Sequence, residues 1–256
     1  MHTHIKYSEF TTKAGLMTAL KQLNTTGLVF LTGVPTDDEK TVIDVARTFG
    51  IVKTTFYGES WAVKNQINSK NIAYTNYNLE LHMDLMYFQS PPALQFLHCL
   101  ENSVKGGVST FADSYHAARI LQKENKPAFD ILCTIPVTFI YENDGHKMKC
   151  SHTTIENYGE DLIVNYAPPF QGILKVPYNS TLDFYDAFRE FESIIKREDM
   201  VYRRLYEVGD LAIFANRRVL HGRDAFSSEN GVRHLRGCYV GVDEYLDTLA
   251  MSNLIE

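Results

Sequence analysis

Two histidines and one aspartate have the types and the spacing of a metal site. One residue separates His82 from Asp84, so on a strand the two-residue period would point both side chains to the same face. The third ligand is predicted far downstream, at His221, at the end of an apolar run typical of a strand. Two histidines and one carboxylate on one face of an iron ion leave three positions open, which is the arrangement of non-haem Fe(II) oxygenases.

The segments around these residues predict a mainly β protein with flanking helices. Helical periodicity is found at 12–23, 37–49, 114–122 and 182–195; strand-like segments recur from 51 to 166 and close the chain at 201–206, 211–215, 219–222 and 233–242. Many short strands with a few helices predict a double-stranded β-helix, or jelly roll, whose sheets bracket a cavity. Such a fold brings early and late strands side by side, so His82, Asp84 and His221 are expected to meet.

The composition predicts a single domain over residues 1–256, because 45% of the chain is hydrophobic and can bury a sizeable core. The net charge of -6, with no lysine-rich run, argues against nucleic-acid and membrane partners and favours a small-molecule substrate. The four cysteines form no C-x-x-C motif, which indicates free thiols in a reducing compartment and predicts a cytoplasmic location.

The motifs around the three candidate ligands resemble those of a known family. They are HMD at 82–84 with SPPALQFLHC at 90–99, GGVS at 106–109, LHGR at 220–223 and RHLRG at 233–237. As a set they resemble the γ-butyrobetaine and trimethyllysine hydroxylases of the TauD-like Fe(II)/2-oxoglutarate dioxygenases, from about Gly27 to Leu246. The resemblance implies a dioxygenase that uses Fe(II), 2-oxoglutarate and O2 to hydroxylate an aliphatic carbon of a small amine or betaine-like substrate.

The resemblance also implies roles for individual residues. The iron ligands would be His82, Asp84 and His221. Arg233 would hold the far carboxylate of 2-oxoglutarate, which needs a planar fork of donors, and Arg236 is the competing candidate. Strand alternation places Arg233 on the face of Tyr239, a family position that lines the substrate pocket, and Arg236 on the other face. Ser109 matches a hydroxyl that helps to hold 2-oxoglutarate.

Aromatic residues match family positions that surround a quaternary ammonium group. They are Tyr57, Trp61, Tyr74 and Tyr239, and Asn71 matches a residue near the substrate carboxylate. Ring faces can bind such a cation without hydrogen bonds. The alternative is that these aromatics belong to the core, since the chain has 15 Tyr and 15 Phe.

Two departures from the family leave the substrate open. Leu85 stands where the animal butyrobetaine enzymes have a tyrosine, and Ala167-Pro168-Pro169 stands where the family supplies a second asparagine. The Cys/His-rich N-terminal domain of the carnitine enzymes is also expected to be absent. A tailoring oxygenase acting on an amino acid or specialised metabolite is therefore an alternative, as are a zinc hydrolase with the same triad and a non-catalytic jelly-roll binding protein. A homodimer, common among related enzymes, is left open.

Overall fold

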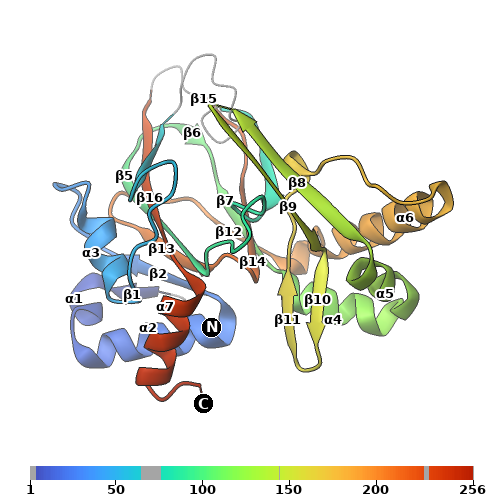
Figure 1. The fold of residues 1–256 in the computed structure, drawn as a ribbon. Helices are drawn as coiled ribbons and strands as arrows, with labels where there is room; N and C mark the ends of the chain where they lie inside the picture. Colours follow the sequence, from blue (N-terminus) through green and yellow to red (C-terminus); the bar gives the residue numbers. More distant parts are fainter. Residues whose placement is uncertain (1–3, 65–75, 144, 228–230, 256) are drawn as a thin grey trace.

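Two facing β-sheets form the centre of the computed structural model, which describes residues 4–64, 76–143, 145–227 and 231–255 (Figure 1). The larger sheet has six strands in the order β1-β2-β13-β5-β16-β3, antiparallel except for β1 with β2. Its strands are β1 (His4–Lys6), β2 (Leu28–Thr32), β3 (Trp61–Lys64), β5 (Leu94–Asn102), β13 (Leu211–Ala215) and β16 (Arg233–Val240).

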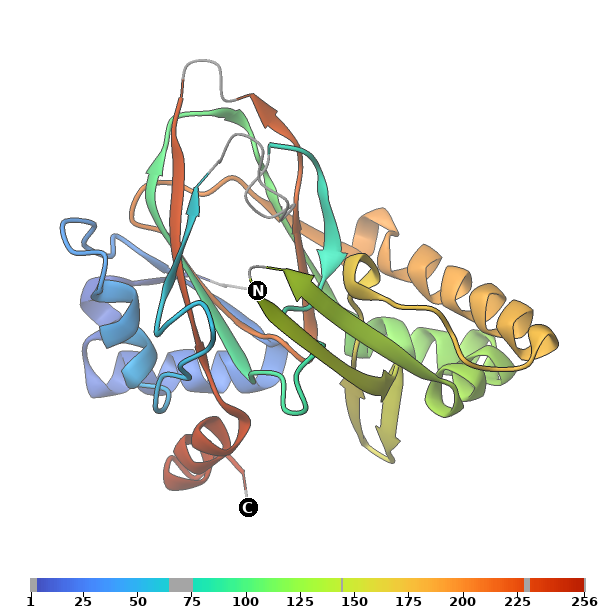
Figure 2. The same cartoon turned by 45° about the horizontal axis from the view of Figure 1, so that its top comes forward.

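The smaller sheet has four antiparallel strands in the order β12-β7-β14-β4. They are β4 (Leu79–His82), β7 (Ser109–Asp113), β12 (Val201–Arg204) and β14 (Val219–Arg223). Figure 2 shows β4 and β14 on one side of the space between the sheets, with β16 and β3 on the other. The predicted mainly β jelly roll is thereby confirmed.

Helices cover the two sheets in separate groups (Figure 1). The larger sheet is covered by α2 (Lys13–Thr26) and α3 (Thr41–Arg47), with α1 (Tyr7–Phe10) beside them and α7 (Val242–Met251) following β16. The second group, beside β14, is α4 (Ser114–Glu124), α5 (Lys126–Thr134) and α6 (Tyr178–Ile195). The remaining elements are β6 (Lys105–Gly106), β8 (Pro136–Asn143), β9 (His146–Thr153), β10 (Ile155–Tyr158), β11 (Asp161–Val164), β15 (Phe226–Ser227) and the 3-10 helices η2 (Pro168–Phe170) and η3 (Glu198–Met200).

Helix ends are marked by local sequence signals. The Thr12 side chain accepts a hydrogen bond from the Gly15 N–H at the start of α2. Gly27 ends α2 with a φ of 74°, a left-handed conformation that glycine adopts without a steric penalty, so that β2 can begin at the next residue. The Asn125 side chain caps α5 in the same way as Thr12 caps α2.

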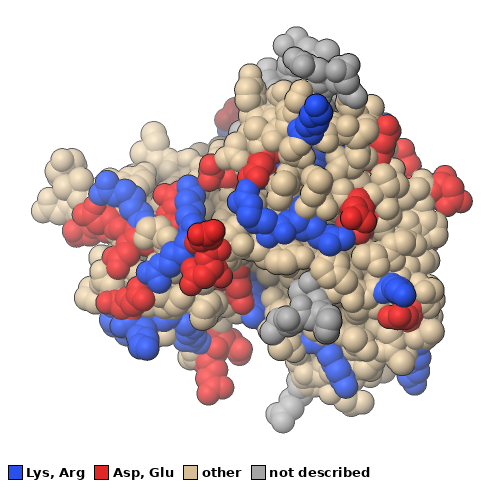
Figure 3. Space-filling model, turned by 180° about the vertical axis from the view of Figure 1, so that it is seen from behind, with Lys and Arg blue, Asp and Glu red and all other residues tan. Residues whose placement is uncertain are grey.

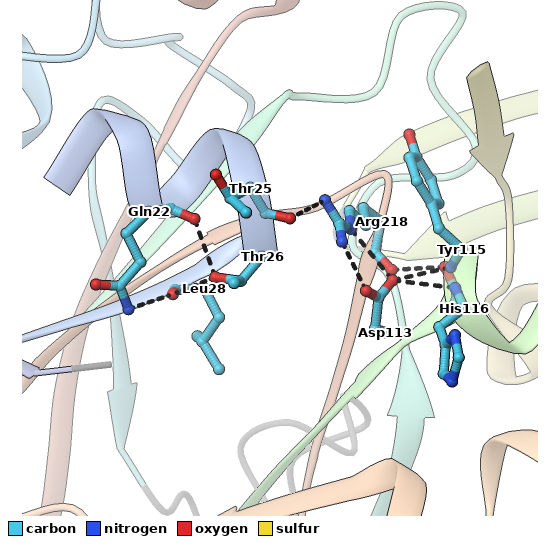
Figure 4. Close-up of polar contacts among 9 residues, drawn as sticks. Gln22, Thr25, Thr26, Leu28, Asp113, Tyr115, His116 and Arg218 are labelled. Atoms are coloured by element: carbon cyan, nitrogen blue, oxygen red, sulfur yellow. Dashed lines mark hydrogen bonds and ion pairs between the residues drawn. The ribbon is translucent and has the colours of Figure 1, made fainter. Parts of the chain in front are cut away.

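An arginine fixes the start of β14, the strand that carries His221. The Arg218 guanidinium donates to both carboxylate oxygens of Asp113, at 3.2 and 2.7 Å, and to the Thr25 carbonyl at 2.9 Å (Figure 4). Asp113 also accepts from the backbone N–H groups of Tyr115 and His116 and so caps α4. The arginine therefore ties β14 to both helix groups.

Aromatic rings fill one end of the space between the sheets. Phe111 on β7 makes edge-to-face contacts with Phe30 on β2 and Phe214 on β13, at centroid distances of 5.6 and 5.5 Å. All three rings are buried. The ring of Phe214 also lies 4.9 Å from the ring of His221, so this aromatic cluster packs against that histidine.

Two details differ from the sequence prediction. The predicted strand through His82 and Asp84 ends at His82, so Asp84 lies in the loop that follows. The interval from 51 to 166 contains a second helix, α5, where only 114–122 was predicted to be helical. Its signals are the Asn125 cap, Pro127 in the first turn and the buried stripe of Ala128, Phe129 and Leu132.

The surface carries both signs of charge. Figure 3 shows Lys and Arg interspersed with Asp and Glu across one face. Arg197, just after α6, lies 2.9 Å from Glu124 on α4, for example, and water and salt screen this exposed pair. Within the described part of the chain, no helix has the length and apolar character needed to cross a membrane.

Candidate active site

His82, Asp84 and His221 meet between the sheets. His82 on β4 and His221 on β14 are directly paired in the smaller sheet. Asp84 Oδ1 lies 3.3 Å from His82 Nε2 and 3.9 Å from His221 Nε2. One ligand atom from each residue lies within 4.8 Å of the others, a spacing that allows a single metal ion to contact all three.

The loop after β4 is held in place by Asn216, a buried residue that the sequence analysis did not single out. Asn216 Oδ1 accepts from the Asp84 N–H at 2.9 Å, and Asn216 Nδ2 donates to the Asp84 carbonyl at 3.0 Å. The amide thus replaces the strand partner that Asp84 lacks.

Leu85 follows with a φ of 62°, a left-handed conformation that is strained for a residue with a branched side chain. The chain is therefore bent sharply next to a candidate ligand.

The protonation states suit metal binding. Burial raises the pKa of Asp84, but the hydrogen bond from His82 and, in acid, the protonated neighbouring histidines outweigh burial and hold that pKa well below the usual range, so Asp84 is ionised at neutral pH. Burial lowers the pKa of His221 to about 3, so this imidazole is neutral at neutral pH. His82 Nδ1 lies 2.8 Å from the Glu80 carbonyl, which assigns the proton to Nδ1 and leaves Nε2 to bind a metal. The donor set therefore fits Fe(II).

Two arginines lie in the same pocket. Arg233 and Arg223 are both 5% exposed and line it together with Ser109 and the three candidate ligands. Among the described residues, the buried Nε of Arg233 has no hydrogen-bond partner. Burial and the neighbouring Arg233 lower the pKa of Arg223 to about 10, so Arg223 still carries its charge at neutral pH. This part of the pocket is suited to an anion.

Arg236 points the other way. Its Nε donates to Ser60 Oγ at 3.1 Å, and its Nη1 lies 3.2 Å from Glu39 Oε2. Strand alternation thus correctly predicted that Arg233 faces the pocket and Arg236 the opposite side of the sheet. This holds although the pairing of β16 with β5 has a register irregularity between His234 and Leu235. That Arg233 binds 2-oxoglutarate stays a prediction.

The predicted aromatic residues are only partly placed. Tyr74 and Asn71 lie outside the described residues. Trp61 stacks on Tyr239 at a centroid distance of 4.1 Å, and Tyr57 lies 6.3 Å from Trp61. At 4.1 Å no cation fits between Trp61 and Tyr239, so a cation could contact only their outer faces. Tyr87 and Tyr141, which the sequence analysis did not identify, are close to the Tyr57 hydroxyl, and burial together with these neighbours raises the pKa of Tyr57 far above the ordinary value.

Acid should destabilise the metal-free protein because of its buried histidines. Burial lowers the pKa of His98 to about 4, from 6.5 in an exposed histidine. Between these two pH values the unfolded chain binds a proton at His98 that the folded chain does not bind. The contribution of the neutral His98 to the free energy of unfolding is therefore complete above pH 6.5 and is lost as the pH falls towards 4. Urea midpoints at several pH values measure this, and His98→Leu should flatten the dependence. A midpoint independent of pH over this window would contradict the expectation.

A jelly-roll core that presents two histidines and one carboxylate to a shared pocket defines a class, the non-haem Fe(II) oxygenases. The chain belongs to the TauD/TfdA family: the model described as "Taurine catabolism dioxygenase TauD, TfdA family" matches residues 3–239. The predicted family is confirmed, and family and donor set together support the predicted cofactors, Fe(II), 2-oxoglutarate and O2.

Curated relatives are similar over most of this chain. Dioxygenase str8 of Strobilurus tenacellus is 42% identical over 95% of this chain and 61% of its own length. Gamma-butyrobetaine dioxygenase of Pseudomonas sp. (strain AK-1) is 35% identical over 87% of this chain and 58% of its own length, and the Homo sapiens protein of that name is 31% identical over 90% and 61%. The chain thus spans about 60% of the length of these relatives.

Solved structures share the fold at low sequence identity. PvcB from Pseudomonas aeruginosa has a TM-score of 0.68 with 18% identity, over 94% of this chain and 87% of that one. An asparagine oxygenase in complex with Fe(II) has a TM-score of 0.69 with 16% identity, over 89% of this chain and 79% of that one. These similarities support the fold assignment alone.

Proposed function

We propose that this chain is an Fe(II)- and 2-oxoglutarate-dependent dioxygenase that hydroxylates an aliphatic carbon of a small amine or betaine-like molecule. The observation that carries the proposal is the meeting of His82, Asp84 and His221 in a pocket that also contains the buried Arg233. A zinc hydrolase could use the same three ligands, but it would leave the buried Arg233 without a function.

The three ligands would hold the metal ion from one side of the pocket. His221 contributes a neutral imidazole, His82 contributes Nε2 while its Nδ1 bonds the Glu80 carbonyl, and Asp84 contributes the one negative charge. Bound Fe(II), with 2-oxoglutarate and O2, supplies the oxidant that removes a hydrogen atom from a substrate carbon and returns a hydroxyl group. Because Asp84 occupies a ligand position that halogenases leave free for chloride, hydroxylation is favoured over halogenation.

Arg233 would hold the co-substrate at its far end. Its guanidinium is a planar fork that matches a carboxylate with two hydrogen bonds. The neighbouring Arg223 adds a second positive charge, so a dianion such as 2-oxoglutarate would relieve the repulsion between the two arginines. Ser109, buried at the start of β7, would add a hydroxyl donor. Apolar side chains that exclude water from this pocket are Val63, Leu79, Leu97 and Leu235.

The substrate side is supported by relatives and by aromatic residues. Relatives named gamma-butyrobetaine dioxygenase and trimethyllysine dioxygenase carry the names of quaternary amines. In this chain Trp61 lines the pocket of the candidate ligands and stacks on Tyr239, whose hydroxyl donates to Asp84, and Tyr57 lies 6.3 Å from Trp61. Ring faces attract a quaternary ammonium group, which has no N–H to donate.

Trp61→Ala should weaken the binding of a quaternary amine roughly tenfold or more, because a desolvated cation–ring contact contributes about 1–2 kcal/mol. Binding of γ-butyrobetaine to the wild-type and variant proteins is measured by calorimetry. The control is the neutral isostere with carbon in place of nitrogen, since loss of the ring also removes apolar contact. Equal losses for both ligands would show that Trp61 recognises shape rather than charge.

A second candidate is a tailoring oxygenase that hydroxylates, desaturates or closes a ring in an amino acid or specialised metabolite. The specific observations are the buried Leu85, where the animal butyrobetaine enzymes have a tyrosine, and the 3-10 helix at Pro168–Phe170, where those enzymes supply a second asparagine. A mass-spectrometric screen of amines, amino acids and small metabolites distinguishes the two, since it reports a gain of one oxygen or a loss of two hydrogens in whichever compound is oxidised.

We further propose that residues 1–256 act as one oxygenase domain in the cytoplasm. The four free cysteines support a reducing compartment, since none is paired. Localisation by fluorescent fusion tests this, and light scattering tests whether the chain forms a homodimer.

A further inference from the structure

The carboxylate of Asp84 has two different sides. Its Oδ1 faces the two histidines, at 3.3 Å from His82 and 3.9 Å from His221. Its Oδ2 accepts hydrogen bonds from Gln95 Nε2 at 2.8 Å and from the Tyr239 hydroxyl at 2.6 Å. One oxygen is thus turned towards the metal ligands of the smaller sheet, and the other is bound by the larger sheet.

The two donors occupy rigid positions. Gln95 on β5 and Tyr239 on β16 are a direct cross-strand pair, and each is 2% exposed. The ring of Tyr239 is fixed further by stacking on Trp61 at 4.1 Å. The Tyr239 hydroxyl is the donor in this contact, because an ionised carboxylate oxygen can only accept. Two donors on one oxygen also hold the carboxylate against rotation.

The number of oxygens that Asp84 gives to a metal decides how many positions stay open. A carboxylate that binds through both oxygens occupies one position more than a carboxylate that binds through one. With Oδ2 engaged by two hydrogen bonds, only Oδ1 is free to bind. A site with three ligand atoms can accept both atoms of a chelating 2-oxo acid and one molecule of O2.

We propose that Gln95 and Tyr239 are positioning residues that make Asp84 a one-oxygen metal ligand and so keep three coordination positions open. This inference rests on the proposed function. It assigns Tyr239 a role beyond the predicted contact with a cation, and it assigns a role to Gln95, a residue of the motif at 90–99 for which the sequence analysis gave none. Outer partners of metal ligands are known to tune metal affinity, so both residues should affect binding directly.

The test uses Co(II) as the metal, because its visible absorption reports the number of ligands without turnover. Tyr239→Phe removes the hydroxyl and keeps the ring on Trp61, and Gln95→Met removes the amide and keeps the side-chain length. Each variant should bind Co(II) roughly 10- to 100-fold more weakly than the wild type and should show a changed visible spectrum. Tyr245→Phe, which changes a buried tyrosine on α7, is the matched control and should behave as the wild type.

Circular dichroism of the metal-free proteins shows which variants fold, and if one does not, the other decides. Folded variants with the wild-type Co(II) affinity and spectrum would overturn the proposal. A change in only one variant would overturn the two-residue form and leave a single positioning residue. Failure of the wild-type chain to bind Co(II) would instead overturn the proposed function, so the two failures are distinguishable.

Discussion

Asp84→Ala should abolish iron-dependent turnover, with the fold left intact. The substitution removes the one charged ligand and leaves His82 and His221, so Fe(II) affinity should fall at least about 100-fold, since even outer partners of metal ligands are worth 10- to 100-fold. Folding should survive because the substitution leaves the apolar core in place, and its main cost to stability is the lost acceptor of Gln95 and Tyr239. Calorimetric titration with Fe(II) under anaerobic conditions and turnover of 2-oxoglutarate measure the two effects.

The matched control is Asp186→Ala, which removes an exposed carboxylate on α6. It should leave metal binding and turnover at the wild-type level, since its partner Arg189 is also exposed. Full activity in Asp84→Ala, or equal losses in both variants, would contradict the assignment of Asp84 as a metal ligand.

Arg233→Lys should raise the apparent KM for 2-oxoglutarate by about 10- to 100-fold, because a hydrogen bond to a charged group contributes about 1.5–3 kcal/mol and an ammonium cannot make the bidentate pair. The kcat at saturating 2-oxoglutarate should change much less, since the arginine holds the end of the co-substrate that does not react. Steady-state kinetics with varied 2-oxoglutarate measures both constants.

Arg236→Lys is the control for this variant, because Arg236 bonds to Ser60 and Glu39 outside the pocket. Its KM should stay close to the wild-type value. A larger effect in Arg236→Lys than in Arg233→Lys would mean that the co-substrate binds on the opposite face of β16.

The three candidate ligands could be predicted because their side chains carry an unusual chemistry in a simple pattern. His82 and Asp84 are two residues apart, and His221 lies in an apolar run that reads as a strand. The structure brings them together for a partly different reason. Asp84 shares a site with His82 not because both lie on one strand but because Asn216 holds the loop after β4.

Other parts of the site carried a weaker signal. Gln95 is a polar residue within an apolar strand sequence, and this could have indicated a buried hydrogen-bonding task, but its partner is set by the pairing of β5 with β16. Asn216 lies in a turn, where asparagine is common, so its contact with Asp84 cannot be read from sequence. Tyr239 was predicted from family position as a ring face, and only the structure shows where its hydroxyl points.

The prediction of the fold class followed from the many short strands, whereas α5, which lies between α4 and β8, was missed. The faces of Arg233 and Arg236 were predicted from alternation along β16, which local geometry fixes. Long-range partners such as Arg223 beside Arg233 depend instead on how the two sheets face each other, and no local pattern encodes that distance.

The central claim is that this site uses iron to decarboxylate 2-oxoglutarate oxidatively. The most direct measurement incubates the purified chain with 2-oxoglutarate labelled with ¹⁴C at C1 and follows the release of labelled CO2 together with succinate. Release should require both Fe(II) and O2, should not occur with Zn(II), and should be lost in Asp84→Ala. The contrary result is a wild-type chain that binds Fe(II) and 2-oxoglutarate but releases no CO2 with any compound of the substrate screen. The chain would then be a binding protein, and the proposed dioxygenase activity would be wrong.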